Sequence, residues 1–217
     1  MNSNRAISIQ SSADLTKYRV NRPGQLEVLR QSFYDFQTYL QAGQTSMLFF
    51  QVPQGQSSKT KADTNMQLAG QLPAGQQFLV QSIEVKLYPS ALPSTGPIAD
   101  AVESLVNDMW NVGKSGWLEF NVGSKNYLTE APLDRFPPKT RLDGWAAMTS
   151  TLTAGAATQS KISYATFAGR PYPIDPYILL ESTQNFAVQL NWPVAVAVAA
   201  NARIGIILDG LLVRNSQ

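Results

Sequence analysis

The side chains best suited to catalysis near neutral pH, histidine and cysteine, do not occur in this sequence. Without them the Ser-His-Asp and Cys-His mechanisms cannot operate, and neither thiolate nor imidazole metal centres can form. An enzyme would have to use carboxylate, lysine or tyrosine chemistry, or a metal ion held by oxygen ligands. Two carboxylates that the fold brings together would suffice for glycoside hydrolysis, and a sequence does not reveal such a pair. We expect a protein that is not an enzyme and has no catalytic residues.

One tripeptide resembles the end of a phosphate-binding loop. Gly113, Lys114 and Ser115 match its last three positions, but the motif also needs a glycine five positions earlier, where Asp108 stands. The motif should open a helix, whereas this tripeptide closes a helical pattern. The acidic residues also lack the spacing of a calcium-binding loop. We therefore predict no cofactor site, no metal site and no small-molecule substrate.

The composition favours a β-rich protein with few surface charges. Of the 217 residues 44% are hydrophobic and only 15% are charged, against about 25% charged in typical soluble domains. Either part of the surface is buried against other copies of the chain, or the outer faces of a large sandwich carry amides and hydroxyls instead. The net charge of +2 is too small to indicate a nucleic-acid-binding domain as a whole.

The N-terminal segment differs from the rest of the chain. Its basic residues, Arg5, Lys17, Arg19 and Arg22, outnumber the single acid Asp14. A helical pattern then starts at a proline and ends at a glycine, with apolar residues three and four positions apart that form one stripe: Pro23, Leu26, Leu29, Phe33, Phe36, Leu40 and Gly43. Residues 1–45 are therefore predicted as an arm with an amphipathic helix, which packs on its own domain or on a neighbouring subunit.

The remainder, residues 46–217, is predicted as one β-domain. Short apolar or alternating runs between glycine- and proline-rich segments indicate strands at 47–52, 78–88, 118–122, 127–128, 161–167, 178–180, 186–192 and 204–213. In the second run the apolar phase changes, which predicts a bulge around Gln81 and Ser82. The longest apolar stretch, Trp192 to Ala200, is far shorter than the roughly 20 residues of a membrane-spanning helix.

One helix interrupts the strands. Ser94 or Thr95 can cap it, and apolar residues from Ile98 to Met109 recur on one face before Gly113. Residues 132–139 are predicted as a rigid extended connection, and residues 149–160 as a mobile loop. Residues 170–177 are extended and rich in proline. Because roughly eight strands occur without β-α-β alternation, the fold is predicted as an antiparallel β-sandwich, specifically a single jelly roll, whose last strand can lie centrally beside the first.

The order of these elements resembles the jelly-roll coat proteins of icosahedral viruses and bacteriophages. The resemblance lies in the basic arm, the short first strand, the inserted helix, and the closing strands at 185–193 and 204–214. It implies a major capsid protein that self-assembles through capsomers into a shell, located in the virion after assembly in the host cytoplasm. It also implies contacts with other virion proteins, and a weak contact of the arm with the genome or an internal membrane.

Three segments are expected to form subunit interfaces, because aromatic residues and arginines are enriched there. They are the apolar stripe (Leu26, Leu29, Phe33, Phe36), the inserted helix (Leu105, Met109, Trp110) and the proline-rich segment (Arg170, Tyr172, Tyr177). The alternative is a receptor-binding or carbohydrate-binding sandwich on a phage spike, in which exposed aromatic rings stack on sugars. Its candidate residues are Trp110, Trp117, Trp145, Tyr172 and Tyr177, most of which we expect to be ordinary core or interface residues.

Overall fold

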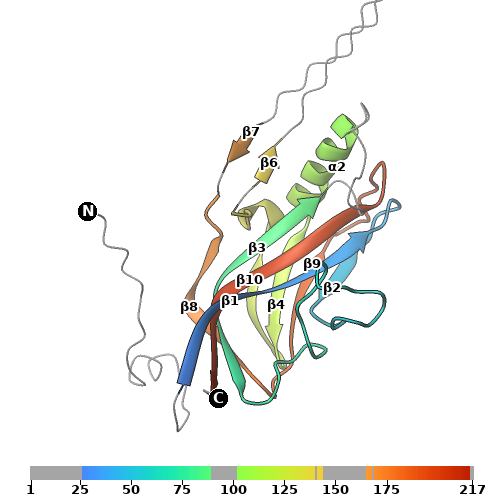
Figure 1. Cartoon of the computed structure of the whole chain (residues 1–217). Coiled ribbons are helices and arrows are strands. Elements are labelled where there is room, and N and C mark those ends of the chain that lie inside the picture. Colours follow the sequence, from blue (N-terminus) through green and yellow to red (C-terminus); the bar gives the residue numbers. More distant parts are fainter. Residues whose placement is uncertain (1–25, 89–101, 140, 144–164, 168, 216–217) are drawn as a thin grey trace, which may run out of the picture.

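The computed structural model describes residues 26–88, 102–139, 141–143, 165–167 and 169–215. Two four-stranded antiparallel sheets face each other and enclose one hydrophobic core (Figure 1). Sheet A contains, in spatial order, β1 (Leu26–Tyr39), β10 (Ala202–Asn215), β3 (Gln76–Tyr88) and β8 (Tyr172–Glu181). Sheet B contains β2 (Ser46–Phe49), β9 (Phe186–Asn191), β4 (Trp117–Val122) and β5 (Lys125–Glu130). The predicted antiparallel β-sandwich is confirmed.

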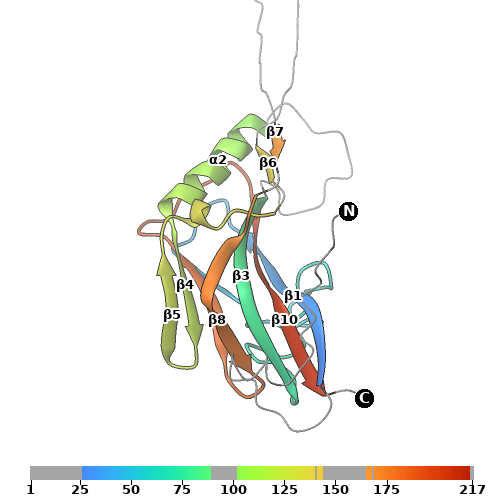
Figure 2. The same cartoon turned by 90° about the vertical axis from the view of Figure 1, so that its left-hand side faces the viewer.

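Three further elements lie at one end of the sandwich. Helix α2 (Val102–Ser115) lies across the end of β4 and β5 (Figure 2), close to the 3-10 helix η1 (Leu133–Arg135). A small hairpin pairs β6 (Arg141–Asp143) with β7 (Ala165–Phe167). The predicted inserted helix is therefore confirmed between β3 and β4. The predicted loop at 149–160 lies entirely in the stretch 144–164, outside the described residues.

The core is built from alternating residues of both sheets. In β9, Phe186, Val188 and Leu190 are buried, whereas Ala187 and Gln189 between them are partly exposed. This is the pattern expected of a strand with one face on a core and one face outside. The prediction of a half-buried strand with an amide-bearing outer face is confirmed here.

The bulge predicted from the change of apolar phase is present in β3. Pairing with β10 shifts between Asp209 and Gly210, which lie opposite Ser82 and Val80, so that Gln81 is the extra residue. Val80 and Ile83 therefore both reach the core, although they are three positions apart. An extra residue in one strand reverses the inside–outside alternation beyond it.

The helix predicted within residues 23–43 is wrong. Residues 26–39 form the strand β1, paired along its whole length with β10, with Leu26 opposite Asn215 and Tyr39 opposite Ala202. Phe33 points into the core, whereas Phe36 points to the outer face of sheet A, where it lies against Gly205. Apolar residues on both faces of one strand reproduced the three- and four-residue spacing of a helix. Of the predicted arm, residues 26–39 belong to sheet A, and residues 1–25 lie outside the described part of the chain.

The last strand, β10, lies between β1 and β3 in sheet A. This central position was expected for it. Its side chains Ile204, Ile206 and Leu208 are fully buried in the core. β10 therefore pairs with β1 on one side and with β3 on the other.

Candidate interaction surfaces

A buried ion pair fixes the long β2–β3 loop against β1. The carboxylate of Asp35 is fully buried, forms an ion pair with Lys59 and accepts a hydrogen bond from the backbone N–H of Phe50 (2.8 Å). The same loop covers part of the free edge of β1, where Tyr34 N–H donates to Asn65 Oδ1 (3.0 Å). These contacts are internal to the chain, and we assign them a structural role.

A second charged cluster lies on the outer face of sheet A. The side chain of Glu84 is only 2% exposed and accepts a hydrogen bond from the backbone N–H of Lys139 (3.0 Å). The Lys139 ammonium forms ion pairs with Glu84 and with Asp209. Burial raises the pKa of Glu84 above its ordinary value, and the neighbouring Asp209 raises this pKa further. Burial alone would lower the pKa of Lys139, but the two carboxylates outweigh it and raise this pKa.

The partners of these two carboxylates belong to the chain itself. The cluster attaches the segment after η1 to sheet A through Lys139. Across the described residues, no three acidic side chains lie close enough together to hold a metal ion. The cluster therefore has a structural role, because it holds the segment after η1 against sheet A.

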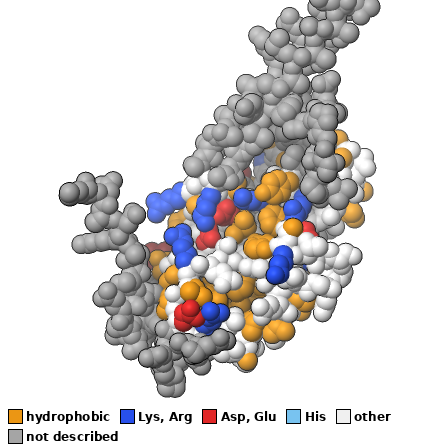
Figure 3. Space-filling view, viewed as in Figure 1, with side chains coloured by type: hydrophobic (Ala, Val, Ile, Leu, Met, Phe, Trp, Pro, Cys, Tyr) orange, Lys and Arg blue, Asp and Glu red, His pale blue; other side chains and the backbone are white. Residues whose placement is uncertain are grey.

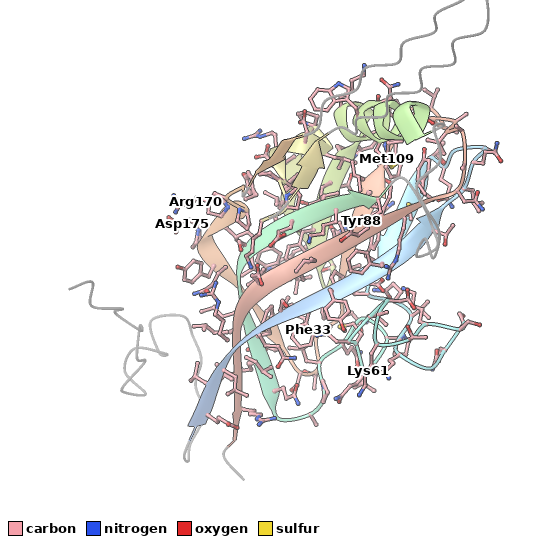
Figure 4. All side chains as sticks on the ribbon, turned by 45° about the horizontal axis from the view of Figure 1, so that its top comes forward. Phe33, Lys61, Tyr88, Met109, Arg170 and Asp175 are labelled. Carbon is pink, nitrogen blue, oxygen red and sulfur yellow. The ribbon has the colours of Figure 1, made fainter. Side chains whose placement is uncertain are left out.

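Two residues of the predicted interface belong to the core. Phe33 is 5% exposed, and its ring packs edge-to-face on Phe78 with centroids 4.7 Å apart. Met109, on the inner side of α2, is 6% exposed (Figure 4). Leu29 is half-buried and packs against the core as well. The residues predicted to form one apolar stripe on a helix therefore do not share one face, because β1 turns Phe33 into the core and Phe36 to the outer face.

The other predicted interface residues lie nearer the surface. Trp110 is 53% exposed on α2, and Phe36 is half-buried on the outer face of sheet A. Arg170 is exposed beside the edge strand β8 (Figure 4). The side chains of Leu26 and Leu105 lie outside those that the structure describes. Nothing in the structure brings these residues together into one site.

Two of the aromatic residues predicted as sugar-binding candidates, Tyr172 and Trp117, make contacts within their own chain. Tyr172 is half-buried and packs on Phe136 with ring centroids 4.8 Å apart. Trp117 is half-buried on β4 and donates its indole N–H to Glu119 (2.8 Å). Tyr177 is half-buried on β8. Trp145 lies outside the described residues, and the carbohydrate-binding alternative stays a prediction.

A small polar pocket opens beside β1. Its volume is about 100 Å³, well below the roughly 300 Å³ or more of pockets that enclose drug-sized ligands. Its lining includes Gln31, Asn65, Gln71, Gln76 and Arg214, with Phe33 among the apolar contacts. The pocket offers hydrogen-bonding groups for a side chain or a few waters.

An exposed apolar surface at one end of the sandwich was missed by the sequence analysis. It is formed by the β1–β2 loop, residues 40–45, and the β9–β10 loop, residues 192–201, which we call together the apolar end. These loops lie side by side (Figure 1) and expose Leu40 (49%) and Val194 (69%). Between Asn191 and Arg203 the chain has no charged residue and reads Trp-Pro-Val-Ala-Val-Ala-Val-Ala-Ala-Asn-Ala.

The apolar end is held in place by hydrogen bonds to the loop backbone. Tyr39 Oη donates to the Val196 carbonyl (2.8 Å), and Val198 N–H donates to the Gln41 carbonyl (2.9 Å). From α2, the carboxylate of Asp108 accepts the N–H of Ala199 (2.6 Å). The chain thus fixes the backbone of a loop that buries Trp192 and Val198 in the core and exposes Val194. The sequence signal for this surface is the uncharged run from Trp192, which is too short to span a membrane but long enough to form an apolar loop.

Comparisons with protein-family models, with curated proteins and with solved structures returned no match to this chain. Within the described part of the chain, no helix has the length and apolar character needed to cross a membrane. The class that the fold and its surfaces define is an antiparallel β-sandwich with an inserted helix and one apolar end.

Proposed function

We propose that the sandwich is a single jelly roll. The support is nested pairing of the eight strands of the two sheets: the first pairs with the last (β1 with β10), the second with the seventh (β2 with β9), the third with the sixth (β3 with β8), and the fourth with the fifth (β4 with β5). A long hairpin folded over on itself gives this pairing, and jelly rolls are built in that way.

We further propose that the protein is a structural subunit that self-assembles as the coat of a virus or bacteriophage. The observation that carries this proposal is the apolar end, where Val194 is 69% exposed on a loop whose backbone is hydrogen-bonded in place. Burying apolar surface contributes about 25 cal/mol per Å², and isolated soluble domains rarely keep large apolar patches in water. A second copy of the chain is the partner that the proposal names.

In a capsomer, each copy of the chain would bury its apolar end against a neighbouring copy. The low content of charged residues, 15% of the chain, also favours a protein that buries part of its surface against other copies. Subunit contacts do not require catalytic or cofactor residues, which agrees with a sequence that has no histidine or cysteine. The exposed Trp110 on α2 offers a second contact at the same end of the molecule.

The test is a pair of matched substitutions compared by size-exclusion chromatography with light scattering. Val194→Asp places a charge on the apolar end, and Tyr127→Asp places one on the edge strand β5, where Tyr127 is 49% exposed. Neither side chain is buried, so both variants should keep the far-ultraviolet spectrum of the wild type. We expect Val194→Asp to reduce the assembled fraction and Tyr127→Asp to leave it unchanged. Equal assembly of both variants and the wild type would remove the support given by the apolar end.

A further inference from the structure

The outer face of sheet A carries a connected set of aromatic and basic side chains. Because Ile204, Ile206, Ile83 and Val85 point into the core, their strand neighbours point outward. The outward set includes Tyr34 and Phe36 of β1, Arg203 of β10, and Lys86 and Tyr88 of β3. Lys61 of the β2–β3 loop adjoins them, since the Tyr34 hydroxyl donates to its carbonyl oxygen (2.5 Å). We call these six residues the aromatic–basic patch.

Glycine at position 205 makes room for the ring at the centre of this patch. Phe36 lies directly opposite Gly205, and a Cβ atom at position 205 would lie 2.1 Å from Phe36 Cε1. The Phe36 ring therefore lies flat across the backbone of β10. Its position is fixed before any partner arrives, which lowers the entropy lost on binding.

Two neighbours complete the platform. The Tyr88 ring stacks beside Phe36 with centroids 6.0 Å apart and an interplanar angle of 30°, and Tyr88 is 41% exposed. The Arg203 guanidinium lies 4.4 Å from the centre of the Phe36 ring. Arg203 also donates to the Ala62 carbonyl (2.7 Å) and to Asp63 (2.8 Å), so it is fixed in place. Tyr88 is thus an exposed ring that packs against Phe36, and Phe36 is in turn held by Arg203.

The patch has cations without acidic partners. Arg203 is paired with Asp63, but Lys61 and Lys86 have no ion-pair partner among the residues that the structure describes. Figure 3 shows Lys and Arg side chains spread over this face among hydrophobic ones. In Figure 4, Tyr88 and Lys61 lie on opposite sides of β10 and β1, so the patch extends across the sheet rather than along one strand.

We propose that the aromatic–basic patch binds single-stranded nucleic acid, with a base stacked on Tyr88 and backbone phosphates on Lys61 and Lys86. Flat aromatic rings next to unpaired cations match a ligand that alternates planar bases with phosphates. A flat exposed ring can stack on the face of a base only where that base is not stacked within a duplex, which favours a single strand, and ring stacking accepts any base. The proposal does not rest on the proposed self-assembly, because none of the six patch residues belongs to the apolar end.

The test is fluorescence anisotropy of labelled single-stranded DNA and RNA oligonucleotides with the full chain, repeated over a range of salt concentrations. Loss of a base–aromatic stack weakens single-strand binding by about 5- to 150-fold, so Tyr88→Ala should weaken binding at least about fivefold. The double variant Lys61→Ala/Lys86→Ala should lower the slope of log K against log salt by about 1.4, since each neutralised phosphate on a single strand contributes about 0.7.

Matched controls come from the edge strand of sheet B. Lys125 and Tyr127 of β5 are also an exposed lysine and an exposed tyrosine, and Lys125→Ala and Tyr127→Ala should bind like the wild type. The proposal is overturned if the wild type does not bind, or if the β5 variants lose as much affinity as the patch variants. It is also overturned if Tyr88→Ala binds normally, or if heparin and anionic lipid vesicles bind as tightly as the oligonucleotide, since these results indicate a general polyanion surface.

Discussion

Asp35, in the middle of β1, forms an ion pair with Lys59 of the β2–β3 loop, and the carboxylate is completely buried. The same carboxylate accepts the N–H of Phe50 (2.8 Å) where β2 has just ended. One side chain therefore joins the first strand of sheet A to the connection that leaves sheet B.

Asp35→Ala should destabilise the fold strongly. The substitution leaves the Lys59 ammonium and the Phe50 N–H without their acceptor, and breaking a buried pair typically costs about 3–5 kcal/mol. Urea unfolding followed by circular dichroism measures this loss. Arg135→Ala is the matched control, because the Arg135–Glu130 pair is 49% and 28% exposed and should contribute at most about 1 kcal/mol. Equal effects of the two substitutions would contradict the structural role of Asp35.

Phe33→Ala should affect folding rather than assembly alone. The ring is 5% exposed and packs edge-to-face on Phe78, and removing a buried phenylalanine costs about 3–5 kcal/mol. We expect a lower free energy of unfolding in urea, whatever the oligomeric state. Leu48→Ala, at a side chain that is 45% exposed, should change this free energy by only about 0.5 kcal/mol. A Phe33→Ala variant of wild-type stability would place this ring at a surface.

Gly205→Ala should destabilise sheet A through Phe36. The new methyl group would lie 2.1 Å from Phe36 Cε1, so the ring must leave its place on β10, at a cost of about 1–3 kcal/mol. In the Phe36→Ala background the methyl group has room, and the same substitution should cost much less. A double-mutant cycle by thermal or urea unfolding measures this coupling. Additive effects of the two substitutions would contradict the contact.

The free energy of unfolding should depend on pH through Glu84. Burial, with Asp209 nearby, raises the pKa of Glu84 above 4.5 in the folded chain, so the folded state keeps a proton that the unfolded state has already released. Stability contributed by this proton is full below the ordinary pKa and is lost as pH rises through the raised value. Glu84→Gln cannot ionise, so its stability relative to the wild type should increase from about pH 4 to pH 8. Urea unfolding across this range measures the difference, and a difference that is constant or reversed in sign would contradict the raised pKa.

The sandwich could be predicted from sequence where the pattern is local. In β9 and β10, regular alternation of apolar and polar residues marked the strands, and in β3 the change of phase located the bulge at Gln81. The apolar spacing likewise indicated α2, although this helix continues past the predicted stop at Gly113 to Ser115, and the predicted cap at Ser94 or Thr95 lies outside the described residues. Each of these signals arises within about ten residues and does not depend on the partner strand.

β1 could not be predicted in the same way, because its structure depends on distant residues. The Phe36 ring has room on the outer face because Gly205 lies opposite it, and the buried Asp35 is stabilised by Lys59 and by the Phe50 N–H. The apolar end has a similar origin, since the backbone of its β9–β10 loop is held by Tyr39 and Gln41 from the end of β1 and by Asp108 from α2. Pairing across most of the chain overrode the local helical spacing.

The central claim, self-assembly into a shell, is tested most directly by light scattering coupled to size exclusion over a wide range of protein and salt concentrations, with negative-stain microscopy of each peak. The account predicts that the wild-type chain forms species far larger than the 23.7 kDa monomer, and that closed rings or shells appear as concentration increases. A species that stays monomeric at every concentration and salt condition would contradict it.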